Sequence, residues 1–127
     1  MCGITAYCGQ EEALPFLMQG LSKLEYRGYD SAGITTIENN QLVTVKCKGR
    51  LENLANILKD RQLHGHVGIG HTRWATHGIP SNLNSHPHTN QDETIALVHN
   101  GIIENYRELK DDLLKQGYHF QSDTDSE

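Results

Sequence analysis

The chain has 127 residues, enough for one domain but too few for two well-packed cores of ordinary size. Its 11 Lys and Arg against 16 Asp and Glu give a net charge of −5 at pH 7, which argues against a protein that binds the phosphate backbone of nucleic acids. Hydrophobic residues make up 36% of the chain and aromatic residues 6%, as in a folded α/β protein with a modest core.

Neither a membrane protein nor a secreted disulfide-rich protein is indicated. No apolar stretch approaches the roughly 20 residues that a membrane-spanning helix needs, and the N-terminus lacks a basic leader with a long apolar region. The three cysteines (Cys2, Cys8 and Cys47) are an odd number without paired spacing, so neither a disulfide framework nor a CxxC metal site is expected. We therefore expect a cytoplasmic protein that does not bind membranes, and one of these thiols is a candidate reactive group.

The first half of the chain predicts two strand regions separated by a helix. Residues 2–8 (CGITAYC) form a short buried strand, which Gly9 ends. From Glu11 onward, apolar residues recur every three or four positions and predict an amphipathic helix to about Arg27–Gly28. Residues 32–38 and 41–48 flank Asn39–Asn40, a connection typical of a β-hairpin.

The middle of the chain combines a helix, a strand and a long polar loop. Leu51, Leu54, Ala55 and Leu58 form a second helical stripe, and residues 67–70 (VGIG) form an apolar strand that leads into His71–Trp74. Residues 75–93 carry Gly, Pro, Ser, Asn and His without periodicity. A loop of this length in a compact domain is usually functional, so we expect a lid over a site.

The last third predicts two more strands around one helix. Residues 94–99 (TIALVH) form a buried strand, and a helix then follows Asn100–Gly101 to about Gln116, where Gly117 stops it. Residues 118–122 (YHFQS) are expected to be a further strand. Thr124-x-x-Glu127 has the pattern of a helix capping box, which predicts that another element would follow.

A cysteine at position 2 is the sharpest chemical feature. A small second residue normally allows removal of the initiator methionine, which leaves Cys2 with a free α-amine. The reference pKa of an α-amine is about 7.7 to 8.0, so at neutral pH part of it is unprotonated and can accept the thiol proton. N-terminal threonine hydrolases follow the same logic. The alternative is a small hydrophobic residue that opens a strand, and the spacing alone does not decide between the two.

Three further features could take part in catalysis or in binding a substrate. Asn100–Gly101 offers a side-chain amide and a backbone N–H, the donors that an oxyanion hole needs, although this dipeptide is also the commonest tight turn. The planar fork of Arg73 could hold a carboxylate, and Asp125 could receive an ammonium group. Each charge singly fits a solvated surface residue. Together they describe a pocket for an amino acid zwitterion.

The eight histidines raise the question of a metal site. His71, His77, His86 and His88 could supply enough nitrogens for zinc, but the sequence has no HExxH motif and no acidic ligand at a telling interval. Hydrogen bonding within turns and loops accounts for most of these side chains. Residues 27–30 also lack the glycine spacing of a phosphate-binding loop. We therefore predict no metal and no cofactor.

Six segments in order carry a resemblance that runs from end to end of the chain. They are MCGITAYCG at the start, LEYRGYDSAGI at 24–34, GHTRWATHGIPS at 70–81, NSHPH at 84–88, VHNGIIENY at 98–106 and SDTDSE at 122–127. Together they resemble the glutaminase domain of the isomerising glutamine-fructose-6-phosphate aminotransferases, which form glucosamine-6-phosphate and are a branch of the class II glutamine amidotransferases.

The resemblance implies an α+β fold, the αββα sandwich of the N-terminal nucleophile (Ntn) hydrolases, with two antiparallel sheets between helical layers. Residues 1–127 would be the N-terminal part of a type 2 glutamine amidotransferase domain. Later strands and helices of that domain, and the sugar isomerase domains, would be absent from this sequence, so we expect a truncated sandwich.

The same resemblance implies roles for eight residues in the hydrolysis of L-glutamine to glutamate and ammonia. Cys2 would be the nucleophile with its freed amine as base, and Asn100 and Gly101 would be the oxyanion donors. Arg73 would hold the α-carboxylate and Asp125 the α-ammonium, while Trp74, Thr76 and His77 would line the substrate loop. In the parent enzyme the isomerase domains would bind fructose-6-phosphate and receive the ammonia.

Two other functions stay open from the sequence. The chain could be the glutaminase part of another class II amidotransferase, such as the phosphoribosylpyrophosphate enzyme, because the acceptor domain that would discriminate is absent. It could also be an inactive fragment of the glutaminase domain, in which Asp125, two residues from the terminus, frays. Unpaired strand edges would then favour self-association into a homo-oligomer.

Overall fold

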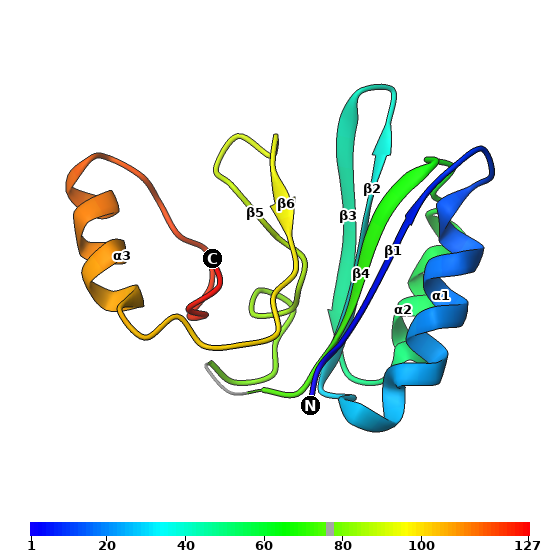
Figure 1. Cartoon of the computed structure of the whole chain (residues 1–127), viewed down its shortest axis with the longest axis horizontal. Coiled ribbons are helices and arrows are strands. Elements are labelled where there is room, and N and C mark those ends of the chain that lie inside the picture. Colours follow the sequence, from blue (N-terminus) through cyan, green and yellow to red (C-terminus); the bar gives the residue numbers. More distant parts are fainter. Residues whose placement is uncertain (76–77) are drawn as a thin grey trace.

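An antiparallel sheet of four strands is the centre of the computed structural model, which describes residues 1–75 and 78–127. Its order is β1-β4-β2-β3, with β1 (Gly3–Cys8), β2 (Ser31–Glu38), β3 (Gln41–Lys48) and β4 (Val67–Arg73). Helices α1 (Ala13–Leu24), followed by the short 3₁₀ helix η1 (Glu25–Arg27), and α2 (Leu51–Asp60) cover one face (Figure 1).

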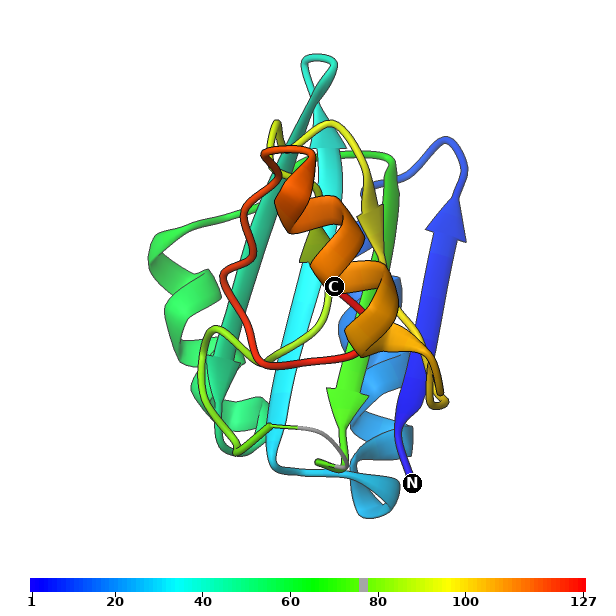
Figure 2. The same ribbon diagram turned by 90° about the vertical axis from the view of Figure 1, so that its left-hand side faces the viewer.

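The opposite face of the sheet carries a smaller layer. Strands β5 (His88–Thr89) and β6 (Ala96–Leu97) pair with each other, and helix α3 (Tyr106–Lys115) lies beyond them. Figure 1 shows the resulting order of helices, sheet, small sheet and helix, and Figure 2 shows α3 in front of the long strands. The predicted α+β sandwich is therefore confirmed. No helix in the two described ranges is both long and apolar enough to cross a membrane.

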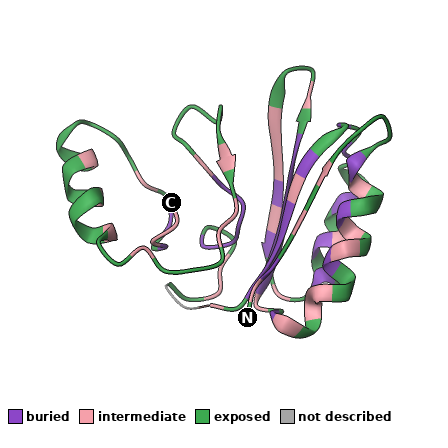
Figure 3. Cartoon of the chain, viewed as in Figure 1, coloured by how far each residue is buried: buried purple, intermediate pink, exposed green. Residues whose placement is uncertain are grey.

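The hydrophobic core lies between the four-stranded sheet and helices α1 and α2 (Figure 3). Leu17 and Leu21 of α1, Ile34 of β2 and Leu54 of α2 are fully buried there. Burying one such side chain contributes about 1.5 to 3 kcal/mol, so this layer supplies most of the apolar stabilisation. Helix α3, by contrast, has no buried residue among those described.

The predicted hairpin is confirmed, and its turn shows why. Asn39 and Asn40 have φ angles of 51° and 62°, which is the left-handed conformation that both central residues of a type I′ turn adopt. Asparagine tolerates that conformation better than most residues. The full register of β2 with β3 follows from this turn, from Glu38 opposite Gln41 to Ser31 opposite Lys48.

The predicted loop at 75–93 differs from a simple lid, because residues 84–88 are buried in the interior. Gly33 in β2 allows this approach, since a Cβ there would collide with the backbone oxygen of His86. Nζ of Lys46 in β3 donates hydrogen bonds to the carbonyl oxygens of Ser85 (2.8 Å) and Pro87 (3.1 Å). This half of the loop therefore forms the second wall of the sandwich.

Three predicted elements are corrected by the structure. The strand at 94–99 shrinks to Ala96–Leu97, because Oδ1 of Asn90 accepts the N–H groups of Thr94 and Ile95 and turns the chain. The helix after Gly101 begins only at Tyr106. The predicted strand at 118–122 was wrong: its N–H groups at His119, Gln121 and Ser122 donate to the side chains of Gln91 and Glu127 instead of to a neighbouring strand.

Candidate active site

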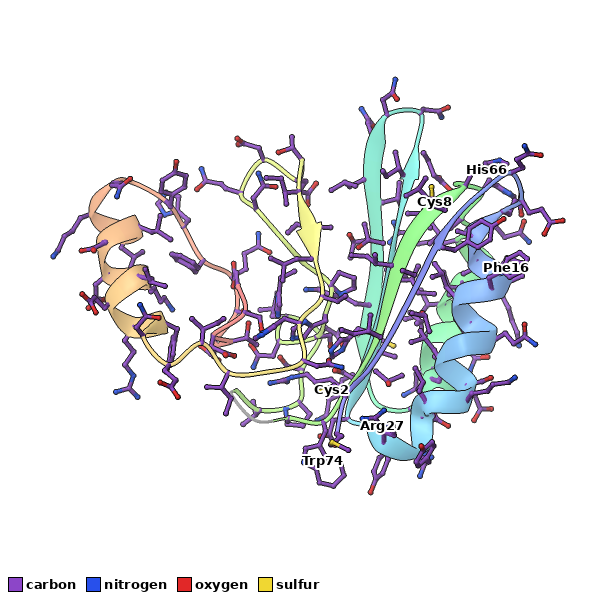
Figure 4. The ribbon with its side chains drawn as sticks, viewed as in Figure 1. Cys2, Cys8, Phe16, Arg27, His66 and Trp74 are labelled. Atoms are coloured by element: carbon purple, nitrogen blue, oxygen red, sulfur yellow. The ribbon has the colours of Figure 1, made fainter. Side chains whose placement is uncertain are left out.

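One end of the four-stranded sheet gathers residues that are distant in sequence. Because the strands are antiparallel, the first residue of β1 and the last residues of β4 are neighbours, and Thr72 pairs with Gly3 on one side and Ala32 on the other. Cys2, Arg73 and Asp30 consequently lie at the same edge. Figure 4 shows Cys2, Arg27 and Trp74 together there, whereas Cys8 and His66 lie at the opposite end.

A cavity of about 400 Å³ opens at this edge. Among the sequence-predicted site residues it is lined by Cys2, Arg73, Trp74, Asn100, Gly101 and Asp125. The structure therefore brings six of the eight predicted residues to one concave site. The other two, Thr76 and His77, lie outside the described residues.

Cys2 lies on the cavity wall and not in the hydrophobic core, unlike the buried Cys47. The backbone N–H of Trp74 donates to Sγ of Cys2 over 3.1 Å. The initiator Met1 is also present at the cavity, and its ammonium group donates to the backbone oxygen of Arg27. This arrangement does not fit the alternative interpretation of Cys2 as a small core residue.

Asn100 and Gly101 do not form a hairpin turn, because helix α3 and not a pairing strand follows them. The Nδ2 of Asn100 donates to the backbone oxygen of Cys2 over 3.2 Å, and its Oδ1 lies 2.8 Å from Nε2 of His71. A Cβ on Gly101 would lie 2.8 Å from Nε2 of His99, so the ring of His99 fits closely against this glycine. The side chain of Asn100 is thus fixed beside Cys2.

Arg73 is a buried cation at the end of β4, only 3% exposed. Its guanidinium donates to the carbonyl oxygens of Gly78 (3.1 Å) and Ile79 (3.4 Å). Burial lowers the pKa of Arg73, and the nearby Cys2, Asp30 and Asp125 act in the opposite direction. An arginine stays protonated under such shifts, so the cavity carries a fixed positive charge.

Asp125 supplies the opposite charge on the cavity wall. Its Oδ2 accepts the backbone N–H of Ile103 over 2.7 Å, which ties the C-terminal segment to the residues after Gly101. Thr124, the preceding residue, is buried, and its Oγ1 is 2.9 Å from Nε2 of His88. These two contacts hold the carboxylate in place despite its position near the end of the chain.

Two supporting residues were not found from the sequence alone. Asp30 accepts the N–H of Ala75 through Oδ2 (2.8 Å), and its own N–H donates to the carbonyl oxygen of Arg73 (3.0 Å). Asn84 donates to the carbonyl oxygen of Ile79 and accepts the N–H of Asp123. Both lie in segments that carry the family resemblance, which was the only signal available for them.

Three of the histidines that the sequence offered as metal ligands pack on one another, which hydrogen bonding within turns and loops did not predict. His71, His86 and His88 are buried side by side: the rings of His71 and His86 stack with centroids 4.1 Å apart, and His88 packs on His86 at 4.5 Å. Burial lowers their pKa values to about 4, 2 and 4 respectively, so all three are neutral at pH 7. Within the two described ranges, no group of three His, Cys, Asp or Glu side chains is arranged so that it could hold a metal ion.

The comparison with protein families shows which family the chain belongs to. The sequence profile of the glutamine amidotransferase domain matches residues 55–127, more than half of the chain. The chain belongs to the glutamine amidotransferase family. The predicted resemblance to the glutamine amidotransferases is thereby confirmed.

Curated relatives of this amidotransferase domain are similar over all of its residues. It is 60% identical over 127 residues to glutamine-fructose-6-phosphate aminotransferase [isomerizing] of Clostridium perfringens, and 61% identical to the enzyme of that name from Clostridium tetani. All of this chain is matched in both comparisons, against 21% of each relative. The chain therefore spans about a fifth of the length of these relatives.

Two solved structures share the fold of the amidotransferase domain. The glutamine phosphoribosylpyrophosphate amidotransferase of Bacillus subtilis, in complex with ADP and GMP, superposes with a TM-score of 0.80 at 34% identity, covering 97% of this chain and 27% of that one. A structure described as the allosteric regulatory enzyme of purine biosynthesis gives 0.81 at 32% identity, covering 95% and 27%. The sandwich predicted from the sequence is the fold of the matched part of these enzymes.

Proposed function

We propose that the amidotransferase domain hydrolyses the side-chain amide of L-glutamine to glutamate and ammonia, with Cys2 as the nucleophile. The observation that carries the proposal is that Cys2, Arg73, Asn100, Gly101 and Asp125 line one cavity of about 400 Å³. Glutamine has a charged amino acid end and a neutral amide end. A site with two opposite charges, a thiol and two N–H donors contains a partner for each of these groups.

The amino acid end of glutamine would bind between the two charges. The guanidinium of Arg73 would hold the α-carboxylate, and the carboxylate of Asp125 would accept the α-ammonium. Hydrogen bonds to charged groups contribute about 1.5 to 3 kcal/mol each, enough to orient a small substrate. Asp125 already uses Oδ2 for the N–H of Ile103, which leaves Oδ1 for the ligand. Trp74, Thr76 and His77 would complete the substrate loop.

Acylation would begin with attack of Sγ of Cys2 on the side-chain carbonyl carbon of glutamine. The thiol proton moves to the free α-amine of Cys2, directly or through one water. Negative charge develops on the carbonyl oxygen, where Nδ2 of Asn100 and N–H of Gly101 donate hydrogen bonds. The amine then protonates the leaving nitrogen, the C–N bond breaks, and ammonia departs from a γ-glutamyl thioester.

In deacylation, water would replace the thiol as the nucleophile. The α-amine takes a proton from water as the oxygen attacks the thioester carbon, and the same two donors stabilise the second tetrahedral intermediate. The C–S bond then breaks, the thiol recovers its proton, and glutamate is released. The α-amine is therefore the base in both halves of the reaction, whereas the nucleophile is Cys2 in the first half and water in the second.

Removal of Met1 is a requirement of this chemistry. With Met1 attached, the nitrogen of Cys2 is an amide, which cannot accept the thiol proton. Met1 is 75% exposed and lines the cavity, so its removal would expose the new amine at the site.

The test is glutamate release from L-glutamine by two forms of the chain with defined N-termini. A form that starts at Cys2, confirmed by intact mass, should hydrolyse glutamine, whereas a form that retains Met1 and a Cys2→Ala variant of the processed form should not. A folded, processed chain without activity would contradict the proposal and favour an inactive piece of the domain.

We further propose that the ammonia is destined for fructose-6-phosphate in the complete protein. The support is the identity of 60% to isomerising aminotransferases over the whole chain, compared with 34% to the phosphoribosylpyrophosphate enzyme. The same proposal holds that the complete protein carries the rest of the amidotransferase domain and the sugar isomerase domains. Glutamine-dependent formation of glucosamine-6-phosphate by the complete protein would test it, and glutamine-dependent amination of phosphoribosylpyrophosphate would contradict it.

A further inference from the structure

The orientation of the Asn100 amide decides whether this side chain can donate to the oxyanion. An asparagine amide has nearly the same shape when its oxygen and nitrogen are exchanged, yet only the nitrogen can donate to an oxyanion. In the flipped state the oxygen of Asn100 would face the developing negative charge and repel it. Something in the structure must therefore select one orientation.

Two neighbours of Asn100 select the same orientation. The backbone oxygen of Cys2 can only accept, so the atom 3.2 Å from it must be Nδ2. Oδ1 then faces Nε2 of His71 at 2.8 Å, and this imidazole nitrogen must carry the hydrogen. Because Nδ2 has two hydrogens, its bond to Cys2 uses one and leaves the other for a ligand.

The surroundings of His71 keep its imidazole neutral and hold it in place as a hydrogen-bond donor. Its side chain is fully buried in β4, and its ring is stacked on that of His86 with an angle of 15° between the planes. Burial lowers its pKa to about 4, against the weaker opposite effects of the Asn100 side chain and the His99 backbone. A neutral imidazole carries one ring hydrogen, and a ring held between a strand and a second ring keeps it directed at Asn100.

We propose that His71 is a positioning residue for the glutaminase reaction: the N–H at its Nε2 fixes the Asn100 amide with Nδ2 directed at the oxyanion. The inference rests on the proposed function. His71 does not line the cavity, so it would touch neither glutamine nor the reacting atoms. It acts on the transition state through Asn100, so its loss should lower kcat and leave KM for glutamine nearly unchanged.

The matched variants are His71→Leu, His71→Gln and Thr72→Val in the processed chain. His71→Leu removes the donor and should lower kcat about 10-fold or more, bounded by the 10² to 10³-fold effect of losing an oxyanion donor. His71→Gln keeps an N–H near the same place and should recover most of kcat. Thr72→Val alters the next buried residue of β4, whose hydroxyl has no partner among the described residues, and should change neither constant.

A double-variant cycle separates positioning from general structural damage. In an Asn100→Ala background, the amide that His71 orients is gone, so adding His71→Leu should slow the reaction no further. An additional loss equal to that of His71→Leu alone would overturn the proposal. So would equal changes in kcat and KM, or a His71→Gln variant as slow as His71→Leu.

The tautomer of His71 gives a test that needs no variant. ¹⁵N NMR of the imidazole in the unmodified, processed chain should show the hydrogen on Nε2 at pH 7. A hydrogen on Nδ1 would overturn the proposal even if glutamine is hydrolysed. Absence of hydrolysis by the processed chain would instead contradict the proposed function, so the two failures are distinguishable.

Discussion

The carboxylate of Asp30 accepts a hydrogen bond from the backbone N–H of Ala75, with Oδ2 2.8 Å from the nitrogen. The N–H of Asp30 also donates to the carbonyl oxygen of Arg73. Gly28 packs against the same backbone, since a Cβ there would lie 2.8 Å from the carbonyl carbon of Arg73. The segment before β2 thereby fixes the backbone around Trp74, whose N–H contacts the Cys2 sulfur.

Asp30→Ala should therefore damage the site although Asp30 does not line the cavity. The variant leaves the N–H of Ala75 without its acceptor, which costs about 1 to 3 kcal/mol of folding free energy, and a shift of about 1 Å at Trp74 or Arg73 costs on the order of 10²-fold in rate. We expect kcat/KM for glutamine to fall by at least about 10-fold, while Asp60→Ala at the exposed end of α2 has no effect. Equal activities would contradict this role.

Asn100→Ala should slow hydrolysis while leaving glutamine binding nearly intact. The variant removes one of two proposed oxyanion donors, a change that typically lowers turnover by about 10² to 10³-fold. Steady-state kinetics should show the loss in kcat, with KM close to that of the unaltered processed chain. Equal loss of binding and turnover would show that Asn100 contacts the ground state and not the oxyanion.

Asp125→Asn should affect the amino acid end of the substrate. Asparagine keeps an acceptor for the N–H of Ile103 but removes the negative charge that the α-ammonium would meet. We expect KM for glutamine to rise about 10- to 100-fold, because a hydrogen bond to a charged group is worth about 1.5 to 3 kcal/mol. Asp123→Asn, two residues earlier and exposed, is the control. A KM that is the same in both variants would remove Asp125 from the binding site.

The buried histidines predict a stability that falls in acid. The pKa values of His71, His86 and His88 are about 4, 2 and 4 in the folded chain and about 6.5 when unfolded. Below pH 6.5 the unfolded chain therefore binds more protons than the folded chain. The free energy of unfolding falls from pH 6.5 toward 4 by about 1.4 kcal/mol per pH unit for each histidine.

Urea unfolding at pH 7.5, 6 and 5 would measure this dependence. His88→Gln should reduce the slope by about one proton, because it removes one of the three groups that protonate on unfolding. His119→Gln, at an exposed position, should leave the slope as it is. An unchanged slope in His88→Gln would show that the pKa of His88 is the same in the folded and the unfolded chain, which contradicts the prediction.

The sequence predicts the elements whose pattern is local. The apolar stripe of α1 and the Asn39–Asn40 turn depend on residues a few positions apart, and both are found as expected. The interior position of residues 84–88 was missed, because it depends on contacts with two residues that lie 39 or more positions away in the sequence. Gly33 leaves room for the segment, and Lys46 binds its carbonyl groups. The strand expected at 118–122 failed for a related reason: strand formation needs a partner, which a local pattern does not reveal.

The candidate site was predictable only to the level of residue types. Cys2 was found as an N-terminal nucleophile, Asn100 as an oxyanion donor, and Arg73 and Asp125 as partners for an amino acid zwitterion. The family resemblance then assigned all four to one site. His71 was considered only as a metal ligand and Asp30 was not singled out, because each acts through a hydrogen bond to another residue of the site. Such contacts join segments 29 and 45 positions apart and leave no local pattern.

The most direct test of the account is covalent labelling of the processed chain with a glutamine analogue that carries an electrophilic side chain. Intact mass should increase by one equivalent of the label, peptide mapping should place it on Cys2, and excess L-glutamine should protect against it. Labelling at Cys8 instead, or no labelling of a folded chain that begins at Cys2, would contradict the claim that Cys2 is the nucleophile of a glutamine site.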